Sequence, residues 1–197
     1  MLYNLHSSLF APERKKRSFV ERILKARQGY RVLDIGCGTA SILAHMPPIE
    51  YVGFDLSEEY VRSAEQRYPE KNATFLHKTL TREVARDIPR FDLAMAIGVV
   101  HHLDDTEAEM LFRIAHEALK SGGRLVTCDG VWVEGQGVLA KMFLSMDRGK
   151  FIRRQEAYVT IAKKVFDDVT VSIHHDLNTL PYSHCVLDCR TSPERAS

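Results

Sequence analysis

The stretch from residue 32 to residue 40, Val-Leu-Asp-Ile-Gly-Cys-Gly-Thr-Ala, most constrains how this chain folds. Its apolar residues predict a short strand that is buried in a parallel sheet. Gly36 and Gly38 then let the backbone turn sharply, and a ligand can approach them closely because they carry no Cβ. The helix expected after such a turn offers backbone N–H groups to that ligand. The stretch therefore predicts a nucleotide-like ligand beyond the end of a buried strand.

Strands and helices alternate along most of the 197 residues, a length for which one domain is the default. This order predicts a doubly wound, mostly parallel α/β sheet with helices on both faces. Ser57 predicts an N-cap, Asp104 and Glu107 predict a capping box, and Gly122-Gly123 is expected to end the helix that the box begins. The strands are expected at 31–35, 50–54, 73–77, 91–97 and 124–128, followed by a closing pair at 168–174 and 183–189.

Three segments are expected to lie outside this alternation. Residues 1–28 predict an N-terminal cap whose helix, over 7–28, ends at Gly29. Residues 131–166 predict a helical insertion over the active site. The polar residues 191–197 predict a flexible tail.

Composition excludes several classes of function. The formal net charge is +1, so no global field favours nucleic acid. The basic run Arg14–Arg17 is interpreted as a solvated helix face rather than a nucleic-acid patch. The four cysteines contain no Cys-x-x-Cys pair, which favours reduced thiols in a cytoplasmic protein and no zinc site. Neither a signal peptide nor an apolar run of about 18 residues is present, so no membrane partner is expected.

Two carboxylates narrow the choice of ligand. The pattern Gly-x-Gly-x-x-Ser over 36–41 lacks the third glycine of the dinucleotide fingerprint. Asp34, just before it, would repel phosphates but suits a ligand with a positive amino or sulfonium group. Asp55 ends the second strand, where a carboxylate can accept both hydroxyls of a ribose. Its alternative role is an N-cap, which Ser57 already supplies. Both acids are expected on one rim of the sheet, because the carboxyl ends of parallel strands meet there.

At these residues the chain resembles the class I S-adenosylmethionine-dependent methyltransferases. The similar stretches are 32–39, 51–57, 91–103 and 119–125, in the order that the family shows. The resemblance implies a seven-stranded Rossmann-like sheet whose last strand is antiparallel. It also implies S-adenosylmethionine as methyl donor and S-adenosylhomocysteine as product. No metal-ligand spacing stands out in the sequence, so no metal is expected.

The resemblance also implies cofactor contacts. They are Asp34 for the amino group, Gly36, Cys37 and Gly38 through their backbone, Ile97 beside the methionine, Asp55 for the ribose hydroxyls, Leu56 against adenine, and Thr79 and Leu80 where many members carry an acid for the adenine amino group.

His101 and His102 follow the fourth strand and are the candidate catalytic residues. Methyl transfer needs alignment, and it needs a base where the acceptor is a weakly acidic hydroxyl. Histidine titrates near neutral pH, so either residue is a candidate base. The alternative, that one of them only braces the loop, stays open.

The resemblance also implies that the acceptor lies under the N-terminal helix, the 131–166 insertion and the last hairpin. Tyr3 and Asn4 are a candidate lid or a frayed terminus. Arg148 and Arg153 are candidates for binding an acidic or polar substrate, although a solvated turn is favoured. The apolar residues of the insertion are interpreted as packing: Met142, Phe143 and Met146.

The sequence thus predicts an enzyme, monomeric or homodimeric, that methylates an oxygen or nitrogen of a small molecule. Similarity to bacterial members suggests a secondary metabolite or a sugar as acceptor. Two alternatives are an RNA or protein methyltransferase and a non-catalytic S-adenosylmethionine-binding protein.

Overall fold

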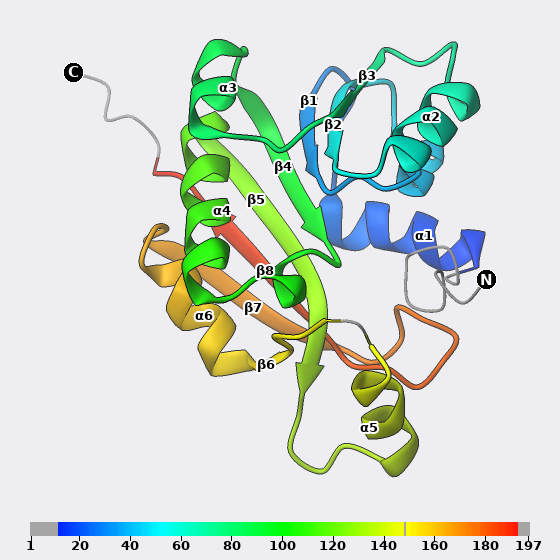
Figure 1. The fold of residues 1–197 in the computed structure, drawn as a ribbon, viewed down its shortest axis with the longest axis vertical. Coiled ribbons are helices and arrows are strands. Elements are labelled where there is room, and N and C mark those ends of the chain that lie inside the picture. The colour runs from blue at the N-terminus through cyan, green and yellow to red at the C-terminus, as the bar shows by residue number, and fades with distance from the viewer. Residues whose placement is uncertain (1–11, 148, 193–197) are drawn as a thin grey trace.

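A computed structural model describes residues 12–147 and 149–192 of the chain. Its centre is one sheet with the strand order β3-β2-β1-β4-β5-β8-β7 (Figure 1). Strand β8 runs antiparallel to both of its neighbours, as expected for the last strand, while β1 to β5 are parallel. A two-residue strand, β6, pairs with β5 and makes eight strands rather than seven. The strands are β1 (Arg31–Ile35), β2 (Glu50–Asp55), β3 (Ala73–His77), β4 (Phe91–Ile97), β5 (Leu119–Trp132), β6 (Arg153–Arg154), β7 (Asp168–His174) and β8 (His184–Arg190).

Helices cover both faces of the sheet, as the alternation predicts. Helices α3, α4 and α6 pack on one face, and α1 and α2 pack on the other (Figure 1). Alternate strand residues supply the two cores, so Leu33 faces α4 while Val32 faces α1. The helices are α1 (Glu13–Phe19), α2 (Glu58–Arg67), α3 (Arg82–Asp87), α4 (Asp105–Ala118), α5 (Val138–Ser145) and α6 (Gln155–Lys163), with short 3₁₀ turns at Ser41–His45 and at Val100–His102 (η4).

Both predicted helix starts are confirmed. The Ser57 hydroxyl accepts a hydrogen bond from the Tyr60 N–H at 3.3 Å. Asp104 accepts from the N–H of Glu107 at 2.9 Å, and Glu107 accepts from the N–H of Asp104 at 3.0 Å. These caps fix where the chain leaves the strand ends that form the ligand rim.

The N-terminal helix is shorter than expected. After α1 a π-helical stretch, Val20–Leu24, ends at Lys25, whose φ of 47° is left-handed, so the helix stops before Gly29. The basic run is not an open patch, because Lys16 is buried and pairs with Glu13 at 2.8 Å, and Lys15 Nζ donates to the Asn178 carbonyl. The expected lid at Tyr3 and Asn4 and the expected tail at 193–197 lie outside the described residues.

Strand β5 is longer at both ends than the sequence suggested. The expectation that Gly122-Gly123 ends the preceding helix was wrong, since α4 ends at Ala118 and Leu119 already pairs with Phe91. Leu119 is buried, and burying it in the sheet outweighs continuing the helix to the glycines. The register then shifts between Phe91 and Leu93, and Gly123 packs closely on the Phe91 carbonyl.

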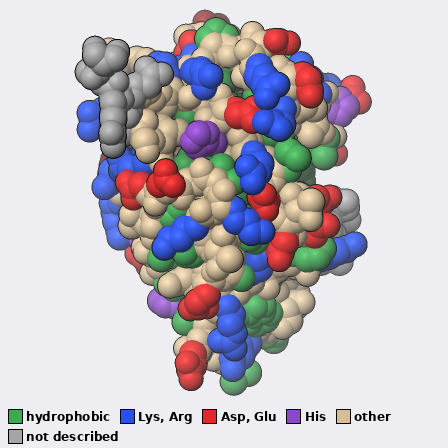
Figure 2. Space-filling view, turned by 90° about the vertical axis from the view of Figure 1, so that its left-hand side faces the viewer, with side chains coloured by type: hydrophobic (Ala, Val, Ile, Leu, Met, Phe, Trp, Pro, Cys, Tyr) green, Lys and Arg blue, Asp and Glu red, His purple; other side chains and the backbone are tan. Residues whose placement is uncertain are grey.

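The insertion is smaller than the segment 131–166. Strand β5 continues to Trp132, and α6 packs against α4, β7 and β8 as a regular helix of the layer. Helix α5 protrudes, and Leu144 is its one buried residue. The interpretation of Met142 and Met146 as packing residues was wrong, because they are 45% and 60% exposed. The described face in Figure 2 carries basic and acidic side chains interspersed, with no field of one sign.

Candidate active site

The loop after β1 is held tightly against the ends of β2 and β4. The N–H groups of Gly36 and Cys37 both donate to the Phe54 carbonyl, at 2.8 and 3.0 Å. Gly36 has φ +74°, and a Cβ on it would lie 2.6 Å from Cγ2 of Val99. The backbone of Gly36 is exposed, so this glycine offers main-chain atoms to a ligand without a side chain in between.

Asp34 is a buried carboxylate beneath this loop. Its side chain accepts a hydrogen bond from the Tyr51 hydroxyl at 2.5 Å, and the residue is 5% exposed. Burial raises the pKa of Asp34 to about 7, although the Tyr51 hydrogen bond lowers it, and the nearby charge of Asp55 raises it further. A cation beside Asp34 would stabilise its charged form. The ammonium group of an amino acid is such a cation.

Asp55 connects the loop to the next helix. Its two carboxylate oxygens accept from the N–H of Gly38 and the N–H of Ser57, each at 2.8 Å. Each carboxylate oxygen can accept a second hydrogen bond, so Asp55 can still bind hydroxyl groups. Leu56, the next residue, is 72% exposed and offers an apolar surface beside that carboxylate.

The other predicted cofactor residues divide into two groups. Ile97 ends β4 and is partly buried against the core on the α1 face, on the same rim as Asp34 and Asp55. Thr79 is exposed. Leu80 is buried among core residues of the α4 face, so Thr79 is the better placed of the two for an adenine contact. The site thus offers Asp34 for an amino group, Asp55 for hydroxyl groups and Leu56 as an apolar surface. Together these groups fit S-adenosylmethionine.

The two histidines after β4 have different environments. His102 is exposed, whereas His101 is 6% exposed, and their ring centroids lie 4.2 Å apart. Nδ1 of His101 lies 2.8 Å from Asp129 Oδ1, and Nε2 lies 3.4 Å from Asp147 Oδ1. Burial opposes the charged ring, but the two carboxylates outweigh it and raise the pKa of His101 to about 9. His101 is therefore an imidazolium at neutral pH.

Asp147 begins a segment that crosses over η4. We call residues 147–153 the strap; residue 148 lies outside the described part of the chain. The second carboxylate oxygen of Asp147 accepts from the Tyr182 hydroxyl at 2.6 Å. A Cβ on Gly149 would lie 2.1 Å from Cδ2 of His101, and the Phe151 N–H donates to the His101 carbonyl at 3.0 Å. The strap is thus shaped around His101. Burial raises the pKa of Asp147, but the hydrogen bonds from His101 and Tyr182 outweigh this and hold it well below its usual range.

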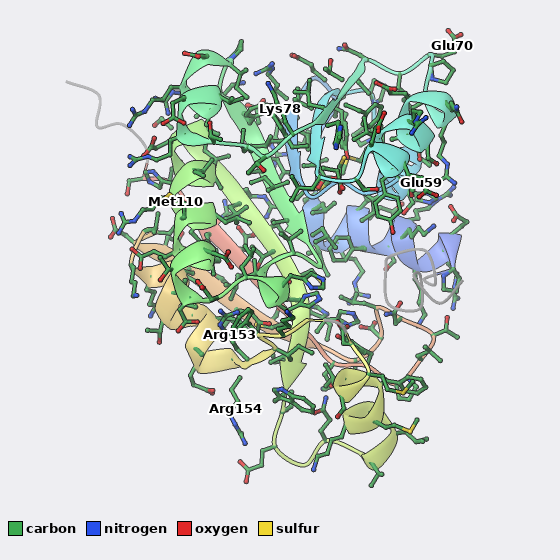
Figure 3. All side chains as sticks on the ribbon, in the orientation of Figure 1. Glu59, Glu70, Lys78, Met110, Arg153 and Arg154 are labelled. Atoms are coloured by element: carbon green, nitrogen blue, oxygen red, sulfur yellow. The ribbon has the colours of Figure 1, made fainter. Side chains whose placement is uncertain are left out.

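Arg153 fixes the far end of the strap. Figure 3 shows Arg153 directed into the protein beside η4, and Arg154 directed outward. The buried guanidinium donates to Asp105 at 2.7 Å and to three backbone carbonyls, those of Val100, Leu103 and Phe151. Arg153 therefore has a structural role. It neither faces a substrate site nor belongs to a solvated turn. Arg148 lies outside the described residues.

Two hollows flank the sheet. One of about 310 Å³ lies between the start of α5 and the last hairpin, and Gln136, His175, Tyr182 and Ser183 are among its walls. Tyr182 connects this hollow to Asp147. A larger hollow of about 470 Å³ lies around Leu119 at the start of β5, at the end of the strands opposite to the glycine loop.

Comparison with known proteins agrees with this geometry. Residues 32–123, from β1 into β5, match a family model described as a methyltransferase domain. Over these residues, somewhat under half of the chain, the sequence is thus similar to a methyltransferase domain. The magnesium protoporphyrin IX methyltransferase of Synechocystis PCC 6803, solved with bound S-adenosylhomocysteine, has the same fold. It superposes with a TM-score of 0.67 at 20% identity, over 91% of this chain and 83% of that one.

Two curated relatives carry names of O-methyltransferases. The O-methyltransferase rstn1 of Aspergillus nomiae is 33% identical over 126 residues, which cover 60% of this chain and 54% of the relative. The ubiquinone biosynthesis O-methyltransferase of a Bradyrhizobium species is 31% identical over 105 residues, covering 52% and 41%. The chain thus spans about half or less of the length of these methyltransferases.

Two further features can be stated for the described residues. Within 12–147 and 149–192, no helix combines the length and the apolar character that crossing a membrane requires. The same residues contain no group of three or more His, Cys, Asp and Glu side chains arranged to hold a metal ion.

Sequence reasoning missed the carboxylates around His101. Asp34 and Asp55 were found because they lie at the ends of the expected strands 31–35 and 50–54. Asp129 directly follows the expected strand 124–128, so the same signal was present there but was not used. Asp147 and Tyr182 come from an insertion and a hairpin, and only the tertiary fold brings them to His101.

Proposed function

We propose that this chain transfers a methyl group from S-adenosylmethionine to an oxygen or nitrogen of a small molecule. The observation that carries the proposal is the buried Asp34 carboxylate beneath the exposed glycine loop, on the same rim as Asp55. When bound there, the cofactor supplies an electrophilic methyl group on a sulfonium ion. The names of the two curated relatives favour oxygen as the acceptor atom.

The chain's own residues have separate tasks in this proposal. Asp34 binds the amino group, the backbone from Gly36 to Gly38 lies along the methionine, and Asp55 accepts from the ribose hydroxyls. Leu56 and Thr79 contact the adenine. Close binding of both partners supplies most of the rate enhancement, because displacement at a methyl carbon depends on alignment.

His102 is the better candidate for the base. A base needs a ring nitrogen with a lone pair, whereas Nδ1 of His101 is hydrogen-bonded to Asp129 at 2.8 Å and Nε2 faces Asp147 at 3.4 Å. His102 is exposed on the turn after β4. In this proposal a ring nitrogen of His102 accepts the proton that the acceptor hydroxyl releases.

The alternatives differ in what they need from the surface. An RNA or protein methyltransferase would use the run Arg14–Arg17 for docking, but Lys15 and Lys16 are engaged within the protein. A non-catalytic binding protein would keep the Asp34 loop and release no product. The hollow of about 310 Å³ beside Tyr182 has the size of a small-molecule site.

The test has two stages. Titration calorimetry with S-adenosylmethionine should give one site. Asp55→Ala should weaken binding at least about tenfold, whereas the exposed control Asp167→Ala should not change it. Unchanged affinity in Asp55→Ala would refute the binding assignment.

Release of S-adenosylhomocysteine is then measured across phenols, sugars and amines. Turnover of any of them supports the enzyme, and His102→Ala should lower kcat by about 10²-fold or more without changing cofactor affinity. Cofactor binding with no release from any pool would favour the binding protein.

A further inference from the structure

The polar groups around His101 form one connected unit. Asp129 Oδ1 accepts from both the backbone N–H and Nδ1 of His101, at 3.2 and 2.8 Å. One carboxylate oxygen of Asp147 lies 3.4 Å from Nε2 of His101, and the other accepts a hydrogen bond from the Tyr182 hydroxyl. A neutral imidazole carries only one N–H, so a ring that faces carboxylates on both sides is held as an imidazolium.

The charges do not cancel within this unit. Two carboxylates face one imidazolium, which leaves one negative charge. The buried cation Arg153, which donates to the Val100 carbonyl beside His101, is paired with Asp105 at 2.7 Å and is therefore already compensated. His184 lies close in β8, and burial lowers its pKa to about 4, so it adds no charge at neutral pH. Oδ2 of Asp129 and Nδ1 of His184 are buried without a hydrogen-bond partner among the described residues.

His102 is the exposed residue that this unit supports. Its ring lies on the ring of His101, with 4.2 Å between centroids, in the same one-turn helix η4. The strap holds that turn through Gly149, Phe151 and Arg153. The position of His102 and the potential around it therefore depend on the unit behind it.

We propose that Asp129, His101 and Asp147 form a fixed charged unit of net charge minus one, which positions His102 and selects acceptors that arrive uncharged or as cations. His101 is a positioning residue in this proposal, and the acceptor of the reaction proposed above carries no phosphate or carboxylate near its reacting hydroxyl. This proposal rests on the proposed function only where it concerns an acceptor, because the charge and its field are properties of the free protein.

The field is measured with a pair of alkylating probes that differ in charge. Iodoacetamide is neutral and iodoacetate is an anion, and peptide mapping by mass spectrometry gives the rate of each at every histidine. Free N-acetylhistidine amide is the reference, because His77 lies opposite Asp55 and its Nε2 is 3.0 Å from the Leu56 carbonyl. We expect the iodoacetamide-to-iodoacetate ratio to be about two- to fivefold higher at His102 than at the free derivative, from one negative charge within roughly 6–8 Å at high effective dielectric. Asp147→Asn should bring the two ratios together.

The charge on His101 is measured independently by nitrogen NMR of the imidazole rings. The His101 ring should show two protonated nitrogens at pH 7.5 in the wild type, and it should lose the second proton at a lower pH in Asp129→Asn than in the wild type. A wild-type His101 that is neutral at pH 7.5, or equal alkylation ratios at His102 and the free histidine derivative, would overturn the proposal.

If either variant fails to fold, these two wild-type measurements still decide. None of them uses S-adenosylmethionine or an acceptor, so failure of cofactor binding would refute the proposed function and leave this result standing.

Discussion

Replacing Asp129 with asparagine should change the way in which stability depends on pH. The amide side chain keeps an oxygen that can accept from Nδ1 of His101 but removes the negative charge. In the wild type the pKa of His101 is raised from 6.5 to about 9, which corresponds to about 3 kcal/mol of stabilisation when the ring is charged in both states. Loss of one of two partner carboxylates should remove roughly half or more of this, about 2 kcal/mol.

The sign and the pH window follow from the raised pKa. Below about pH 6.5 both folded and unfolded protein carry the proton, so the full stabilisation is present. Between pH 6.5 and about 9 the unfolded state loses the proton first, so the stabilisation fades as pH rises. The gap between wild type and Asp129→Asn should therefore be about 2 kcal/mol near pH 6 and close to zero above pH 9.

Urea unfolding followed by circular dichroism at several pH values measures this gap. Taking the difference between the two proteins cancels groups that titrate elsewhere, including Asp34. The exposed control Asp167→Asn should stay within about 0.5 kcal/mol of wild type throughout. A gap that is the same at pH 6 and at pH 9 would refute the reasoning, because it would show that asparagine disturbs packing rather than charge.

Three further outcomes are expected. Gly36→Ala should lose about 2 kcal/mol of stability in urea unfolding, since its Cβ meets Val99 and its φ is left-handed; restoration by Val99→Ala in the double variant would attribute part of that loss to the clash. Arg153→Gln should cost about 3 kcal/mol, because it leaves buried carbonyls without a donor, whereas the exposed neighbour Arg154→Gln should be neutral; equal thermal melting of both variants would contradict this. Cofactor affinity should fall as pH drops below about 7, because Asp34 is then protonated, and calorimetry on Asp34→Asn should show weak binding without that pH dependence.

The ends of β1 to β4 could be predicted from sequence because each carries its own local signal. Buried parallel strands are apolar runs, and the capping groups Ser57 and Asp104 mark where the following helices begin. The ligand rim then follows from topology alone, because parallel strands place their carboxyl ends together. Only the environment of Asp34 needed the structure, since its burial depends on Tyr51, which comes from the next strand.

The sequence alone did not predict the structure where two local preferences competed. Gly122-Gly123 is a good helix end, but Leu119 gains more by entering the sheet beside Phe91. Met142 in α5 and Met146 just after it resemble core residues, yet they remain 45% and 60% exposed. Periodicity shows which residues are apolar, but it does not show which parts of the fold will bury them.

By itself, the sequence determined the sheet and the rim with Asp34, Gly36 and Asp55, because short-range patterns encode strands, turns and caps. Only the tertiary structure decided the state of His101. Its partners Asp129 and Asp147 lie 28 and 46 positions away along the chain, and a histidine acquires its charge from whatever groups the fold places beside it.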